Sequence, residues 1–224
     1  MGIKTKNELV IFSGDIPDLS RDKLNLLLGN KKIVKCMTDR ISTSTLEFIA
    51  AALKPGARLL LDSSITQDNM VLVAKKMNTG AILSQGANTA IPNVAAVAKA
   101  LKPGARLLLA PSISKENMAV VVKELNRGGI LLLDPSISQD QMEAAAQALN
   151  QDTFLFLDAD TTAGNITAAA KEIARGATLL LDSRITRDNM EAAAKAMSRR
   201  GTLLLDPTTS QGKMKAVARA LNPG

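Results

Sequence analysis

The chain has 224 residues, 46% of them hydrophobic, and a formal net charge of +7 at pH 7. It contains no histidine, which excludes Ser-His-Asp and Cys-His catalysis and removes the commonest ligand of transition metals. Trp and Tyr are also absent and only four Phe are present, so stacking platforms for single-stranded nucleic acid are not expected.

No segment of the sequence is typical of secretion or membrane insertion. No apolar run approaches the length of a membrane span, and the first residues lack the long apolar core of a signal peptide. Lys6 occupies the place where N-myristoylation needs Ser or Thr, and the single Cys36 excludes an internal disulfide framework. We expect a cytoplasmic protein, with other compartments left open, and no cofactor.

A repeat of 24 residues organises the chain, and counting back from residue 224 gives nine copies that begin at residue 9. Such a period is the signature of a solenoid or another array. In the copy 57–80, residues 59–61 predict a short strand because three leucines end at a polar boundary. Thr66 is placed to cap a helix, and Gly80 to supply a left-handed residue directly after it. The apolar stripe of this helix is Met70, Val73, Ala74 and Met77.

The first two copies are irregular. Residues 9–32 have a longer loop at 13–18 and a shorter helix from Ser20, as terminal capping repeats often do. The second copy, 33–56, has Lys35 where later copies have leucine. We therefore expect residues 9–32 to form an N-terminal cap.

Two later copies are also unusual. In residues 81–104, Ser84, Gln85 and Gly86 replace Leu-Leu-Asp, and Ile91-Pro92 predicts a shifted helix start. A polar residue at a core position must find a hydrogen bond or destabilise the fold. The last copy, 201–224, ends without a polar capping repeat, which predicts a fragment, self-association through this repeat, or cover from the first repeat.

These elements predict an α/β fold: a right-handed solenoid of nine strand–loop–helix repeats, with a parallel sheet on one face and helices on the other. We expect a single repeat domain over residues 1–224, in which residues 33–224 form eight regular repeats. Units of the type AVAKALKPGARLLLDPSIS resemble shortened leucine-rich repeats of the ribonuclease-inhibitor-like kind. The resemblance implies a strand-lined horseshoe but carries over no functional residues. The family's asparagine ladder is missing, since the loop has Ser64, Ser112, Ser136 or Arg184. Consensus engineering would produce the same regularity, so a natural or engineered origin stays open.

Side chains of the strands alternate between two faces. Leucines at the third and fifth repeat positions should face the helices, together with the methionines Met70, Met118, Met142, Met190 and Met214. The second and fourth positions form the opposite face, which is either an exposed apolar interaction surface or one side of a sheet buried on both faces. We favour binding of another protein on this face. The candidate residues are Arg58, Leu60, Arg106, Leu108, Leu132, Phe154, Phe156, Leu180 and Leu204.

Aspartates follow five of the strands. In a closed, barrel-like arrangement they would form a ring able to hold a ligand or cation, whereas each aspartate can instead accept hydrogen bonds from its own loop. The five are Asp62, Asp134, Asp158, Asp182 and Asp206. Cys36 is expected at a fourth strand position as a small packed residue, because no histidine is available to activate it.

The positive charge has a regular distribution. One basic residue recurs at the same position of successive helices, which predicts a solubilising outer surface and argues against nucleic-acid binding. These residues are Lys75, Lys99, Lys123, Lys171, Lys195 and Arg219. The sequence thus predicts a non-enzymatic scaffold with an unidentified protein partner; the alternatives are the ligand-binding barrel and a structural or designed self-assembling repeat.

Overall fold

The computed structural model describes residues 7–11, 28–29, 31–199 and 201–221. Within these residues, nine strands alternate with helices and all strand pairs are parallel, which confirms the predicted α/β repeat fold. The chain divides into two compact units, Met1–Leu108 (the N-terminal unit) and Leu109–Gly224 (the C-terminal unit). The predicted loop at 13–18 and the helix from Ser20 lie outside the described residues, and the single repeat domain stays a prediction.

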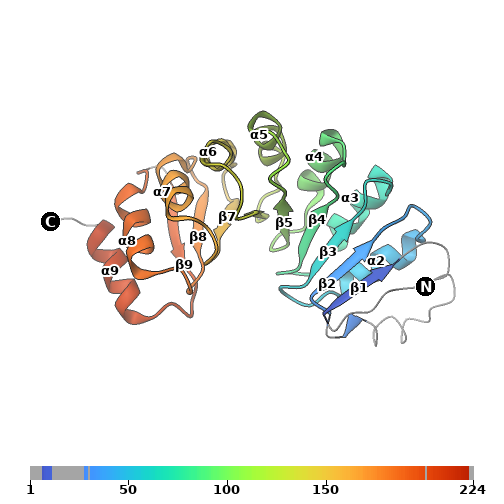
Figure 1. Ribbon diagram of the computed structural model, residues 1–224, viewed down its shortest axis with the longest axis horizontal. Coiled ribbons are helices and arrows are strands. Elements are labelled where there is room, and N and C mark those ends of the chain that lie inside the picture. The colour runs from blue at the N-terminus through green and yellow to red at the C-terminus, as the bar shows by residue number, and fades with distance from the viewer. Residues whose placement is uncertain (1–6, 12–27, 30, 200, 222–224) are drawn as a thin grey trace. The chain divides into compact units, whose positions relative to one another are not determined.

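In each unit the strands follow one another in chain order, and the helices cover one side of the sheet (Figure 1). The N-terminal unit contains β1 (Glu8–Ile11), β2 (Ile33–Cys36), α2 (Thr43–Ala52), β3 (Arg58–Leu61), α3 (Gln67–Lys76), β4 (Ile82–Gln85), α4 (Ile91–Ala100) and β5 (Arg106–Leu109), whose last residue passes the boundary. The C-terminal unit contains α5 (Lys115–Lys123), β6 (Ile130–Leu133), α6 (Gln139–Ala148), β7 (Phe154–Leu157), α7 (Ala163–Glu172), β8 (Thr178–Leu181), α8 (Arg187–Ala196), β9 (Thr202–Leu205) and α9 (Gln211–Leu221).

The predicted N-cap at Thr66 is confirmed. Thr66 has an extended backbone, and its side chain accepts a hydrogen bond from the Asn69 N–H, as expected of an N-cap. Ser138 forms a full capping box, because the Gln141 side chain in turn accepts from the Ser138 N–H. Four further helices begin with the same hydroxyl cap, at Ser42, Ser114, Thr162 and Thr186.

The predicted shift of the α4 start is wrong. α4 begins at Ile91, which corresponds to Gln67 at the start of α3 one repeat earlier. Pro92 occupies the first turn, where the backbone N–H groups have no helical partner, so proline disrupts no hydrogen bond there. What α4 lacks is the side-chain cap, because its N-cap residue is Ala90, which has no side-chain acceptor, where α3 has Thr66.

The core lies between the sheet and the helices. Third- and fifth-position leucines are buried in the internal strands; Leu59, Leu131 and Leu179 are 0% exposed. Four of the five stripe methionines are also buried, as predicted. Met214 is 44% exposed, and it lies in the last repeat of the chain, where Leu203 and Leu205 are also only half-buried.

The repeats are joined by a glycine turn, which differs from the expected helix cap. Gly56 has a φ of +80°, but α2 already ends at Ala52, with its C-cap at Leu53. The turn begins at Lys54, whose carbonyl accepts the Ala57 N–H at 3.0 Å, so Gly56 is the third residue of a four-residue turn of the type II kind. The left-handed conformation was predicted correctly, and its place directly after the helix was not.

Asp152 is the one described non-glycine residue with a positive φ, at 63°, in the turn before β7. A left-handed conformation costs an L-residue roughly 1–2 kcal/mol, less for Asp than for most. Asp152→Gly should therefore raise the free energy of unfolding by up to about 1 kcal/mol, because relief of the left-handed strain outweighs the extra freedom of glycine in the unfolded chain, measured by urea denaturation. The exposed ion pair that it removes, Asp152 with Arg127 at 3.8 Å, is worth little. The control is Gly56→Ala. A Cβ at this position would meet nothing within 4 Å, so the variant should lose stability only because alanine disfavours the positive φ. Equal stability of Asp152→Gly and the native chain would contradict this account.

The first repeats are one residue longer than predicted. β2 pairs with β3 so that Ile33 lies beside Arg58 and Cys36 beside Leu61, an offset of 25 residues, whereas β3 and β4 are offset by 24. The N-caps Ser42 and Thr66 are again 24 apart, so the extra residue lies in the loop between β2 and α2. Every residue of β2 is therefore one place further along the repeat than the count from the C-terminus implies.

Candidate functional site

The side of each sheet that faces away from the helices, formed by strand positions two, four and six, is called the strand face here. In β3, β5, β6, β7 and β8, the residues at positions two and four are half-buried, whereas the residues between them, on the helix side, are fully buried. Position two is Arg58 in β3, and position four is Leu60. The strand face is therefore neither a fully exposed surface nor one side of a sheet buried on both faces. Its residues are less buried than the core, and neighbouring side chains cover them in part.

The strand face of the N-terminal unit is mixed in polarity. The Arg58 Nε donates to the Ser84 Oγ at 2.8 Å, and this hydroxyl donates to the Leu59 carbonyl at 3.3 Å. Ser84, 1% exposed, has thus found the partners that its burial requires. Lys35 forms an ion pair with Glu8 on β1. Because of the longer second repeat, Lys35 lies at position four of this face, beside Leu60, and not at a core position.

The strand face of the C-terminal unit is apolar. None of the described residues at positions two and four of β6 to β9 is charged, and only two threonines interrupt the apolar side chains. We call this set the apolar patch: Ile130, Leu132, Phe154, Phe156, Thr178, Leu180, Thr202 and Leu204. In register, Ile130 lies beside Phe154 and Leu132 beside Phe156. Leu204, in β9, is the most exposed of the large apolar residues of the patch at 47%.

The aspartate column behaves as a set of loop caps. Asp62 Oδ1 accepts the Ser64 N–H at 2.9 Å, and this donor lowers the pKa of Asp62 below its ordinary value. Asp134, Asp158 and Asp182 likewise accept an N–H two residues further on, at 2.7–3.1 Å. The same arrangement holds Asp206. Among the described residues, no group of three or more acidic or cysteine side chains is placed to hold a metal ion.

Cys36 does not lie on the strand face. Its partner in register is Leu61, a fifth-position residue, so the thiol points to the helix side, and the side chain is 0% exposed. Burial raises the pKa of Cys36 to about 12, which keeps it as a neutral thiol at physiological pH. The predicted fourth position was wrong because of the longer second repeat, and the predicted packing role is consistent with its burial.

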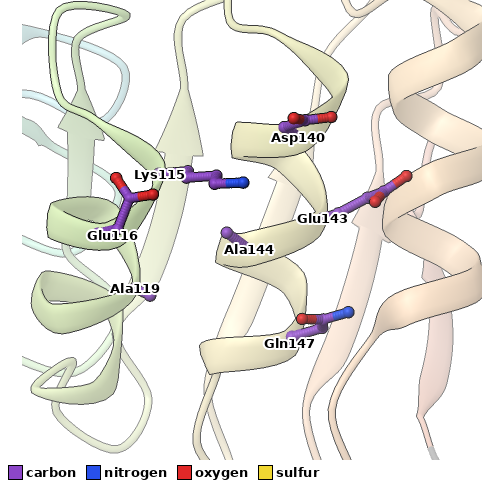
Figure 2. Close-up of a pocket in the computed structure, with 7 residues that line it drawn as sticks. All are labelled: Lys115, Glu116, Ala119, Asp140, Glu143, Ala144 and Gln147. Atoms are coloured by element: carbon purple, nitrogen blue, oxygen red, sulfur yellow. The ribbon is translucent and has the colours of Figure 1, made fainter.

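A shallow groove lies on the helix side of the C-terminal unit, between α5 and α6 (Figure 2). It exists because Ala119 of α5 and Ala144 of α6 are too small to fill the space between the helices. Lys115 extends from α5 towards α6, and Asp140 and Glu143 line the groove from α6 (Figure 2). The charged side chains around the groove are exposed or half-buried, so it lacks the enclosed, convergent polar groups of a ligand site.

The sequence did not reveal a set of side chains that joins successive repeats. In α6, α7 and α9 of the C-terminal unit, the third helical residue donates back to a loop carbonyl of the preceding repeat. The Asn165 Nδ2 donates to the Ile137 carbonyl at 3.1 Å, and the Gln141 Nε2 to the Ile113 carbonyl at 2.6 Å. Lys213 Nζ reaches the Ile185 carbonyl at 2.7 Å. These donors connect each of these helices to the loop of the preceding repeat, and their varied residue types (Asn, Gln, Lys) give no constant sequence motif.

A comparison with known protein families finds no match, and a comparison with curated proteins finds none either. The leucine-rich-repeat resemblance therefore rests on the strand–turn–helix pattern alone. Every helix in the described part of the chain is too short or too polar to cross a bilayer.

Proposed function

We propose that the chain is a non-enzymatic scaffold that binds another protein on its strand face. The observation that supports this most strongly is the apolar patch of the C-terminal unit. A partly exposed apolar surface that is not interrupted by charge is typical of an interaction site. Phe154 and Phe156 form its centre, since aromatic residues with large contact area dominate protein interfaces.

The edge of the patch supports the same function. The position-six carboxylates of Asp134, Asp158, Asp182 and Asp206 lie at the carboxyl ends of its four strands. Interfaces commonly combine an apolar centre with a polar rim. A suitable partner would bury apolar side chains against the patch and place polar or basic groups at this edge. Arg58, Leu60, Arg106 and Leu108 belong to the strand face of the N-terminal unit, whose mixed polarity suits a different kind of contact.

The test is a peptide selection against the intact chain, because such a selection finds binding peptides before the natural partner has been identified. Peptides selected from a random library on the native chain are measured against Leu132→Asp/Phe156→Asp, which places two carboxylates in the middle of the patch. We expect most selected peptides to lose at least tenfold in affinity, about 1.4 kcal/mol or more. The fold should survive, since both replaced side chains are half-buried on the open side of the sheet.

The matched control is Val120→Asp. Val120 is 51% exposed on α5, so this change adds a carboxylate to an exposed apolar position on the helix side of the same unit. Peptide affinities should stay within about twofold of the native chain. Selected peptides that bind the double variant as well as they bind the native chain would refute the assignment of the patch.

A further inference from the structure

The net charge of the chain belongs entirely to one of its units. Residues 1–108 contain 15 Lys and Arg against 8 Asp and Glu, whereas residues 109–224 contain 13 of each. The N-terminal unit therefore carries the whole formal charge of +7, and the C-terminal unit carries none. Net charge of one sign raises the local concentration of partners of the opposite sign. The two strand faces should for this reason select different chemistry.

Cationic side chains of the N-terminal unit extend onto its strand face. Arg58 of β3 and Arg106 of β5 lie in register on either side of Ile82, each at position two. They are two strands apart, which separates their backbones by about 9.6 Å. Both are half-buried, and their near neighbours at position four include Leu60 and Leu108. Each arginine is thus anchored at a strand position with apolar neighbours, and the core lies on the other side of the sheet.

Arginine in such a setting is suited to carboxylates. Its planar guanidinium can form two parallel hydrogen bonds to a carboxylate, and charges that are partly removed from water are screened less by salt. The described residues at positions two and four of β1 to β5 include no aromatic side chain, so these positions lack the aromatic rings on which single-stranded nucleic acid usually stacks. Apolar side chains between the two arginines favour a polypeptide as the source of the carboxylates.

We propose that the strand face of the N-terminal unit binds an acidic polypeptide segment, with carboxylates on Arg58 and Arg106 and apolar side chains over Ile82. This inference rests on the proposed function, because it names the partner class for one part of the same face. The spacing makes it specific. A segment in the polyproline II conformation has three residues per turn and rises about 3.1 Å per residue, so two acidic residues three apart point to the same side about 9.3 Å apart and match the two arginines.

The experiment measures fluorescence anisotropy of a labelled peptide with the core Glu-Leu-Val-Glu against the full chain. A peptide with Gln-Leu-Val-Gln is the matched ligand control. Arg58→Gln/Arg106→Gln should weaken binding of the acidic peptide about tenfold or more, and Arg58→Lys/Arg106→Lys, which keeps the charge without the planar fork, should give an intermediate loss. Circular dichroism of the variants shows whether the fold persists after loss of the Arg58–Ser84 hydrogen bond.

The protein control is Lys75→Gln/Lys99→Gln, which removes the same charge from exposed positions on α3 and α4. Its affinity should stay within about twofold of the native chain. The inference is overturned if this control loses as much as the arginine variant, if the glutamine peptide binds equally well, or if the acidic peptide shows no binding up to about 1 mM. Tighter binding of a thymidine oligonucleotide than of the acidic peptide would overturn it in favour of nucleic acid.

Failure of this inference can be separated from failure of the proposed function. Leu132→Asp/Phe156→Asp alters only the C-terminal unit and should bind the acidic peptide as the native chain does. If the acidic peptide fails while selected peptides still depend on the apolar patch, this inference alone is wrong. If selected peptides are insensitive to both strand faces, the proposed function is wrong.

Discussion

Leu131→Ala is expected to destabilise the chain by about 3 kcal/mol, whereas Leu132→Ala, one residue further along β6, should cost about 1 kcal/mol or less. Leu131 is 0% exposed against the helices, so its truncation removes buried methyl groups and leaves a cavity in the core of the unit. Leu132 is half-buried on the strand face, where truncation creates no enclosed cavity. Two neighbouring leucines of the same strand should thus differ by about 2 kcal/mol.

Urea denaturation followed by circular dichroism measures the difference. The comparison is made between the two variants, because a chain of two units need not unfold in a single two-state step and the relative midpoint is the safer quantity. Leu155→Ala and Phe156→Ala repeat the test on β7, where Leu155 is again 0% exposed and Phe156 half-buried. Equal losses within each pair would show that the strand face is as buried as the core, which would remove the basis of the proposed binding surface.

Much of the fold can be predicted from the sequence, because each repeat contains several independent signals. The cap at Thr66, the buried Ile65 before it and the stripe from Met70 onwards each limit where a helix can begin and which side it buries. The same signals recur at the same repeat positions in most of the nine copies, so the elements of an irregular copy can be placed by comparison with its neighbours. The helix start at Ile91 shows that the repeat frame outweighs a local proline signal.

The register of the first repeats could not be predicted in the same way. An extra residue in the loop after β2 has no signature of its own, because loops tolerate insertions and the flanking first copy is irregular. One residue is enough to exchange the two faces of a strand. Cys36 was therefore predicted on the strand face but lies on the core side, and Lys35 was predicted at a core position but lies on the strand face.

The partial exposure of the strand face could not be predicted, because the strands consist almost entirely of apolar residues. A run such as Leu131, Leu132 and Leu133 has no alternation between apolar and polar residues, so the period of two that marks a one-sided sheet is lost. A continuous apolar run is equally typical of a sheet buried on both faces. Only the structure shows that positions two and four are partly open, and only the division into units shows that the charge of the chain is concentrated in one of them.

Asn165→Ala should destabilise the C-terminal unit by about 1–3 kcal/mol, the second largest effect that we expect from a single substitution. The Asn165 side chain is 4% exposed and donates to the Ile137 carbonyl of the preceding repeat. Its removal leaves this carbonyl without its donor in a buried place, and it weakens the contact between two repeats rather than within one. Stability of stacked repeats depends on these nearest-neighbour contacts as well as on each repeat.

Asn189→Ala provides the matched control, because Asn189 is the third residue of α8, as Asn165 is of α7. Its backbone N–H bonds to the Thr186 cap, and its side chain makes no hydrogen bond within the described residues. Asn165→Ala should lower the urea midpoint clearly and Asn189→Ala only slightly, and Asn165→Gln, which keeps an amide donor, should recover part of the loss. If both alanine variants lose the same stability, the back-donated hydrogen bond contributes nothing, and the stacking of repeats depends on apolar packing and the backbone turns alone.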